Sequence, residues 1–155
     1  DSRKAEPLKE MLADAKEAGL NMLVCSSYRS VERQQELYDE YMGEAVRAGK
    51  SYWQALAETR KSTAHPGRGE HNLGLAVDIV SANYTNLDTK QEETPEAKWL
   101  AENCSRYGFI LRYPVDKTDI TGIIYEPWHY RYVGVEDAMK ITEMGITLEE
   151  YLGED

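Results

Sequence analysis

Basic residues are scarce in this 155-residue chain: 18 Lys and Arg stand against 28 Asp and Glu, leaving a formal net charge of −10. Nucleic acids and anionic membrane surfaces are bound through basic patches, so neither is expected as the main partner. Long apolar runs are also missing, because no stretch approaches the roughly 18 residues that cross a bilayer. No amino-terminal segment has the composition of a signal peptide.

Cysteine and phenylalanine are nearly absent. The two cysteines, Cys25 and Cys104, lack the CxxC spacing of a thiolate metal site. They form either one disulfide or two free thiols; we expect free thiols, and only the geometry of the fold distinguishes the two. A single Phe stands against eleven Tyr and three Trp. Because Tyr and Trp carry a polar group on an apolar ring, they suit a wet groove as well as half-buried packing.

The composition is that of one globular domain, with 41% hydrophobic and 30% charged residues. Periodicity and turn residues predict helices over residues 7–19, 31–48, 51–60, 94–107, 135–144 and 148–152. They predict strands over residues 21–26, 75–80, 109–113, 123–125 and 128–133. Helices come first and then mix with strands, without a regular βαβ rhythm. This order favours an α+β fold with a small, mainly antiparallel sheet flanked by helices, in a single domain over residues 1–155.

Two of the helices begin after a serine that suits the N-cap position, Ser30 and Ser51. The first of these helices is expected to have Leu37, Tyr38, Tyr41 and Val46 on its inner face, and the second carries the apolar residues Trp53, Leu56 and Ala57.

Two segments concentrate the candidate chemistry, residues 68–79 (RGEHNLGLAVDI) and residues 125–131 (YEPWHYR). They supply His71, Asp78 and His129, and two imidazoles with one carboxylate leave one tetrahedral zinc position open for water. Glu126, three residues before His129, is then free to take a proton from that water. An acidic residue within an apolar strand needs a partner, and Gly74 is expected to mark the bend that brings His71 to the face of Asp78.

Two further candidates carry weaker signals. His65 is an alternative to Asp78 as a ligand, and it is less favoured because residues 63–69 form a loop rich in Pro and Gly. Arg29 lies between a strand end and a helix start, where functional residues concentrate.

The order and spacing of these motifs resemble the zinc D-alanyl-D-alanine carboxypeptidases of the VanY type, together with the related VanX dipeptidases and peptidoglycan L,D-carboxypeptidases. The resemblance covers roughly residues 20–152. It is carried by the segments 28–30 (YRS) with Gln34, 69–78 (GEHNLGLAVD), 108–113 (GFILRY) and 120–134 (ITGIIYEPWHYRYVG).

The resemblance implies a fold shared with the Hedgehog signalling domain and a role for each matching residue. His71, Asp78 and His129 match the zinc (Zn²⁺) ligands, Glu126 the catalytic base, and Arg29 an arginine that stabilises the developing oxyanion. The residues expected to bind substrate are Tyr28, Ser30, Gln34, Arg112 and Trp128. Arg112 is also the first of four candidates for binding the terminal carboxylate, the others being Arg131, Arg68 and His65.

The implied reaction is the hydrolysis of the terminal D-Ala from peptidoglycan stem peptides by a monomer located outside the cytoplasm. Three alternatives remain open: an L,D-carboxypeptidase acting on tetrapeptide stems, a non-catalytic zinc-stabilised module that binds the cell wall, and an endopeptidase. Two positions depart from the family pattern, since Gly69 stands where a Ser is usual and His65 where an Arg is common. Both departures bear on the preference for stem peptides.

Overall fold

The computed structural model describes residues 1–153. The strands in this span are β1 (Met22–Ser26), β2 (Ala76–Ser81), β3 (Phe109–Leu111) and β4 (His129–Tyr132). The α-helices are α1 (Ala5–Glu17), α2 (Val31–Arg47), α3 (Tyr52–Ser62), α4 (Pro95–Asn103), α5 (Thr118–Thr121), α6 (Val135–Met144) and α7 (Leu148–Leu152). Three short 3₁₀ segments are η1 (Ser2–Lys4), η2 (Thr89–Glu93) and η3 (Cys104–Tyr107).

The four strands form one sheet in the order β1-β2-β4-β3, and every neighbouring pair is antiparallel. This confirms the prediction of an α+β fold around a small antiparallel sheet. All six residues of β2 are buried, because this strand has a neighbour on each side and is covered on both faces. The edge strand β1 alternates between half-buried and exposed residues instead.

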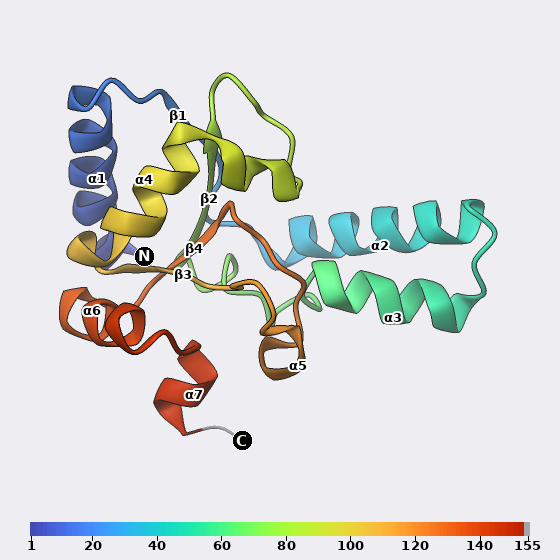
Figure 1. The fold of residues 1–155 in the computed structure, drawn as a ribbon. Helices are drawn as coiled ribbons and strands as arrows, with labels where there is room; N and C mark the ends of the chain where they lie inside the picture. Colours follow the sequence, from blue (N-terminus) through green and yellow to red (C-terminus); the bar gives the residue numbers. More distant parts are fainter. Residues whose placement is uncertain (154–155) are drawn as a thin grey trace.

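The main core lies on one face of the sheet, under α1, α4 and η3, which Figure 1 shows together beside the strands. Its buried members are Met11, Val77, Ile79, Leu100, Cys104, Tyr107, Phe109 and Tyr130. A smaller cluster joins Ile110 of β3 to Ala138 and Ile141 of α6. Because side chains alternate along a strand, the neighbours of the core residues in β2 and β4 point to the other face.

Helices α2 and α3 form a hairpin, the helical arm, which projects from the body of the molecule (Figure 1). Both expected N-caps are present: Ser30 accepts a hydrogen bond from the backbone N–H of Arg33, and Ser51 takes part in a capping box with Gln54.

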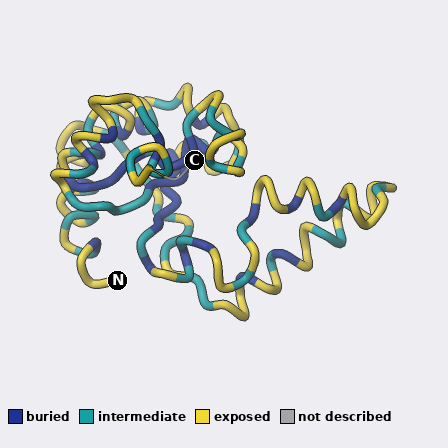
Figure 2. The backbone as a smooth tube through the Cα atoms, turned by 90° about the horizontal axis from the view of Figure 1, so that it is seen from below, coloured by how far each residue is buried: buried dark blue, intermediate teal, exposed yellow. Residues whose placement is uncertain are grey.

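The predicted inner face of α2 was only half right. Tyr38 is buried and Leu37 half-buried, whereas Tyr41 and Val46 are exposed. In α3, Trp53 is 75% exposed. Ala55 and Thr59 provide the buried positions of α3. Figure 2 shows the physical reason: the arm extends away from the buried body, so most of its surface meets solvent whatever its apolar pattern.

Two local predictions near the carboxyl-terminal half were also wrong. Residues 123–125 form no strand, and the N–H of Ile124 instead donates to the carbonyl of Lys61 at the end of α3. Residues 114–121, where the sequence predicts neither helix nor strand, contain the short helix α5. Elsewhere the expected free thiols are confirmed for Cys25 and Cys104. Over residues 1–153, no helix is long and apolar enough to cross a membrane.

Candidate metal centre and active-site cleft

The sheet register places two of the candidate ligands side by side. Asp78 of β2 pairs with His129 of β4, the first residue of its strand. Their strand neighbours Val77 and Tyr130 point into the main core, so Asp78 and His129 share the opposite face. The Nδ1 atom of His129 lies 3.1 Å from Oδ1 of Asp78.

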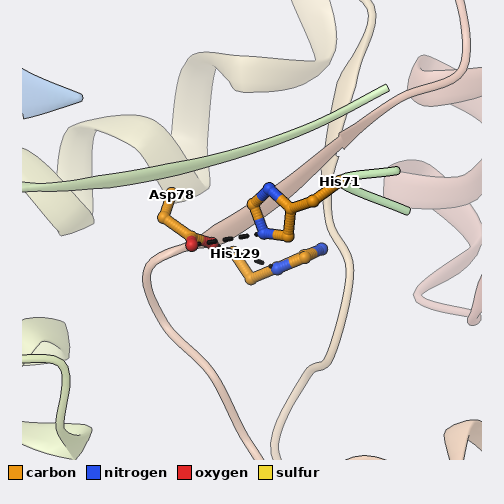
Figure 3. Close-up of side chains that lie close together, drawn as sticks. All are labelled: His71, Asp78 and His129. Carbon is orange, nitrogen blue, oxygen red and sulfur yellow. Dashed lines mark ion pairs between the residues drawn. The ribbon is translucent and has the colours of Figure 1, made fainter. Parts of the chain in front are cut away.

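His71 reaches the same point from the turn before β2. Gly74 adopts φ of +71°, a left-handed conformation that glycine adopts without steric cost, and its N–H donates to the carbonyl of His71. This turn replaces a straight strand, as the sequence predicted, and moves His71 to the face of Asp78. Nε2 of His71 lies 3.2 Å from Oδ2 of Asp78, and Figure 3 shows the three side chains converging.

Each imidazole is oriented by a contact on its far nitrogen. Nδ1 of His71 lies 2.6 Å from the carbonyl oxygen of Ser27, and Nε2 of His129 lies 3.3 Å from Oε2 of Glu70. Because both oxygens only accept hydrogen bonds, those nitrogens carry the protons. Nε2 of His71 and Nδ1 of His129 are therefore the atoms that can bind a metal, in the pattern of a ligand supported by a second contact.

The residues present fit a metal ion. One ligand atom from each of His71, Asp78 and His129 lies within 4.8 Å of the others, and all three residues are buried. Within the described chain, Oδ1 of Asp78 is buried and makes no hydrogen bond. A cation between the three groups would satisfy that oxygen. Two nitrogens and one carboxylate oxygen are also a donor set that zinc accepts.

Electrostatics keep the aspartate in the state that a ligand requires. Burial on its own would raise the pKa of Asp78, but the adjacent imidazoles of His129 and His71 outweigh it and hold that pKa well below its usual range. Burial would lower the pKa of His129, yet the carboxylates of Asp78 and Glu70 raise it to about 9. A metal ion that bound here would therefore displace a proton from His129.

Glu126 lies beside the three residues without joining their cluster. It precedes β4, is buried, and has Oε2 at 3.7 Å from Nδ1 of His129. Burial raises the pKa of Glu126 to about 8; the charge of Asp78 adds to this, and His129 and Arg29 oppose it. A carboxylate whose pKa is near neutrality is suited to accept a proton and return it.

Arg29 approaches the same site from the loop between β1 and α2. Its Nη2 lies 3.8 Å from Oδ2 of Asp78 and donates to Oγ of Ser26 at 2.8 Å. Its Nη1 donates to Oε1 of Gln34 at 2.9 Å, and Nε2 of Gln34 donates to the carbonyl of Ala64 at 2.8 Å. Gln34, predicted as a groove residue, thus also fixes the guanidinium of Arg29.

These groups line one cleft of about 820 Å³, which the helical arm borders on one side. Among the residues predicted from the sequence, the cleft is lined by Tyr28, Arg29, Ser30, Gln34, His71, Asp78, Glu126, Trp128 and His129. Arg112 does not line it. The guanidinium of Arg112 is bound to Glu70 and Glu149, which gives it a partner other than a substrate carboxylate.

Two of the remaining candidates also have other contacts. Arg131 pairs with Glu70 at 2.9 Å. His65 packs its ring against Tyr38, 5.6 Å between ring centroids, and is not among the clustered ligands. Three residues at the site escaped sequence reasoning: Ser27, Glu70 and Tyr113. Only Glu70 carried a signal, as an acidic residue directly beside His71 in the motif.

A buried site of two histidines and an aspartate, with a free glutamate in an open cleft, defines the class of metal-dependent hydrolases. Comparison with known families agrees. The model of the VanY family, D-alanyl-D-alanine carboxypeptidase, matches residues 1–135, and the chain belongs to this family.

Relatives of known name lie close in sequence and structure. The D-alanyl-D-alanine carboxypeptidase of Enterococcus faecalis is 47% identical over 98% of this chain and 55% of its own length. The putative carboxypeptidase YodJ of Bacillus subtilis is 40% identical over 95% of this chain and 51% of its own. The chain spans about half the length of these curated relatives.

Solved structures share the fold. VanYB in complex with D-alanine-D-alanine superposes with a TM-score of 0.90 at 46% identity, covering 100% of this chain and 83% of that one. A VanY mutant from a VanB-type resistance cassette, in complex with Zn(II), superposes with a TM-score of 0.87 at 45% identity. The match covers 98% of this chain and 83% of that one. The LdcB LD-carboxypeptidase superposes with a TM-score of 0.85 at 38% identity, and the match covers 98% of this chain and 67% of that one.

Proposed function

We propose that this chain is a zinc-dependent D-alanyl-D-alanine carboxypeptidase that removes the terminal D-Ala from peptidoglycan stem peptides. The observation that carries the proposal is the convergence of His71, Asp78 and His129 in a cleft, with Glu126 beside them and outside the ligand cluster. Support comes from relatives that carry this activity in their names and from a relative bound to Zn(II).

The residues divide the chemistry among them. His71, Asp78 and His129 would hold zinc, which when bound polarises the scissile carbonyl and acidifies water. Glu126 accepts the proton of the attacking water and returns it to the departing D-Ala amine. Arg29 stabilises the negative charge that develops on the carbonyl oxygen, because its guanidinium is fixed at the site by Gln34 and Ser26.

Two other functions remain as candidates. Similarity to the LdcB LD-carboxypeptidase favours the removal of a single D-Ala from tetrapeptide stems as the alternative reaction. A non-catalytic zinc-stabilised module that binds the cell wall is the third possibility, and the presence of a buried Glu126 at the site argues against it.

The test measures D-Ala released from two peptides, a pentapeptide ending in D-Ala-D-Ala and a tetrapeptide ending in one D-Ala. We expect release from the pentapeptide, loss of release after chelation, and recovery when zinc is added back. Release from the tetrapeptide alone would establish the L,D-carboxypeptidase instead. If neither peptide released D-Ala while zinc was bound, the non-catalytic binding module and the endopeptidase would be the functions left.

The place of action and the assembly state are proposals of the same kind. Peptidoglycan stems lie outside the bacterial membrane, so we propose that the native protein acts there, secreted or anchored. The predictions of a monomer and of a single catalytic domain over residues 1–155 stay predictions.

A further inference from the structure

Four charged side chains beside the metal centre form a buried cluster that the proposed reaction does not use. They are Glu70, Arg112, Arg131 and Glu149, and their side chains expose between 10% and 17% of their surface. Burying charges costs free energy unless each has partners of good geometry. The contacts of the cluster, followed outward from the metal centre, indicate what it does.

Glu70 uses its two carboxylate oxygens for different partners. Oε2 lies 3.3 Å from Nε2 of His129, while Oε1 accepts from Nε of Arg112 at 2.7 Å and lies 2.9 Å from Nη1 of Arg131. The ion pairs with the guanidiniums of Arg112 and Arg131 place two cations on Oε1, so the carboxylate acts as a hydrogen-bond acceptor toward all three partners.

This contact determines which nitrogen of His129 faces the metal. With its proton on Nε2 and directed at Glu70, the ring presents Nδ1 to Asp78, 3.1 Å away. A ring rotated by half a turn would leave the buried Oε2 of Glu70 without that partner. A carboxylate on the far nitrogen also makes the imidazole a better ligand.

Arg112 connects Glu70 to the carboxyl-terminal helix α7. Its Nη1 and Nη2 donate to the two carboxylate oxygens of Glu149 at 2.9 and 2.6 Å, a bidentate pair of fixed orientation. Its guanidinium also lies over the ring of Tyr113, 4.9 Å from the centroid, and that ring packs against His129 at 4.8 Å. Arg112 thus supports the imidazole of His129 along two paths.

We propose that Glu70 is a positioning residue that holds His129 with Nδ1 toward the metal, and that Arg112 and Glu149 hold Glu70 in place. Two adjacent residues of the turn before β2 then serve the metal site: His71 is itself a ligand, and Glu70 orients the second imidazole, that of His129. The inference rests on the proposed function in one respect, because it requires His129 to bind zinc.

The test measures zinc affinity by competition with a chelating dye. Glu70→Ala should weaken zinc binding by about 10- to 100-fold, the usual effect of removing such a support. Glu70→Gln should lose less, because its amide oxygen still accepts from Nε2 of His129. Glu149→Gln should weaken binding by a smaller factor than Glu70→Ala.

Glu150→Gln is the matched control. Glu150 is the next residue of α7, but it pairs with the exposed amine of Lys117 and caps the helix at Thr147. Glutamine preserves such a capping box, so zinc affinity should stay at the wild-type value.

A second readout separates positioning from a merely structural ion cluster. In the zinc-bound protein, the proton on Nε2 of His129 should exchange with water faster in Glu70→Ala and in Glu149→Gln than in the wild type. NMR measures this exchange rate. A merely structural cluster would lower the melting temperature of the variants without changing zinc affinity or this exchange rate.

The outcomes are distinct. Wild-type zinc affinity in folded Glu70→Gln and Glu149→Gln, together with wild-type exchange in Glu149→Gln, would overturn the positioning role. These two variants decide the matter if Glu70→Ala does not fold. If the wild type itself neither binds zinc nor releases D-Ala, the proposed function fails. If the wild type does both and the variants match it, only the positioning role fails.

Discussion

At the scale of single residues, the metal centre contains two buried carboxylates whose pKa values are moved in opposite directions. Asp78 lies between two imidazoles that hold its pKa below the usual range, whereas burial raises the pKa of Glu126 to about 8. Such a separation assigns different roles to two nearby acids. The separation suits the roles proposed for them, with Asp78 ionised as a ligand and Glu126 exchanging a proton near neutral pH.

The role of Arg29 can be tested with one variant that removes its charge and another that keeps the charge but lacks the planar guanidinium. Arg29→Ala should lower kcat by about 10²- to 10³-fold, the cost of losing one donor to a developing oxyanion. Arg29→Lys should recover part of that loss, because it keeps the charge without the planar fork. Zinc content measured on the same samples is the control, and wild-type kcat in Arg29→Ala would contradict the assignment.

The burial of Cys104 leads to a prediction for how the free energy of unfolding depends on pH in the alkaline range. Burial raises the pKa of its thiol to about 12, against about 8.5 in an unfolded chain. The resulting stabilisation is complete below pH 8.5 and is lost as the pH rises through 12, because the unfolded state then releases the proton more readily.

Between these pH values, wild-type unfolding free energy should fall more steeply than that of Cys104→Ala. The difference in slope should reach about 1.4 kcal/mol per pH unit. Urea denaturation at a series of pH values measures both slopes. Equal slopes would show that Cys104 is not protected by the fold.

At the scale of elements, local signals predicted all four strands of the sheet and most of the helices, and they failed between residues 114 and 125. The bounds of α6 and α7 were predicted from their sequence, and Ser30 and Ser51 begin their helices as expected. Residues 123–125 have strand-like composition but pair with the arm rather than with the sheet. The outward direction of the arm depends on tertiary packing, which apolar spacing within one helix does not contain.

Gly108, between η3 and β3, lies in close contact with the chain around Tyr132 and Gly134, and a substitution there can test this packing. It adopts φ of +83°, and an added Cβ would lie 2.8 Å from the ring of Tyr132 and 3.0 Å from the backbone of Gly134. Gly145 at the end of α6 has φ of +65° with no atom within 4 Å of such a Cβ. The two glycines thus differ in steric contact while sharing a left-handed backbone.

Gly145→Ala should therefore cost about 1–2 kcal/mol of unfolding free energy for the backbone alone. Gly108→Ala should cost a further 1–3 kcal/mol or so, because its neighbours must shift. Chemical denaturation measures both values. Equal destabilisation by the two substitutions would contradict the close packing at Gly108.

At the scale of the whole molecule, the proposed ligands come from three separate places: the turn at His71, strand β2 and strand β4. The sequence identified these residues because they lie in two dense motifs, and the fold brings them together. It did not identify the supporting contacts. Ser27 acts through a backbone carbonyl, and Arg112 is engaged by Glu149, 37 residues away.

Zinc binding should consequently stabilise the entire fold. A ligand that binds only the folded state adds about 2.7 kcal/mol when present at 100 times its Kd. The melting temperature of the wild type should rise when zinc is added and fall after chelation. In His71→Ala the zinc-dependent rise should be much smaller, and an undiminished rise would place the metal elsewhere.

In the proposed function, Glu126 moves protons while His71, Asp78 and His129 hold the metal. The most direct measurement determines zinc content and D-Ala release on the same preparations of wild type and Glu126→Gln. We predict equal zinc, near one per chain, and a loss of turnover by about 10²- to 10⁴-fold in the variant. Retained turnover, or loss of zinc together with activity, would contradict this division of roles.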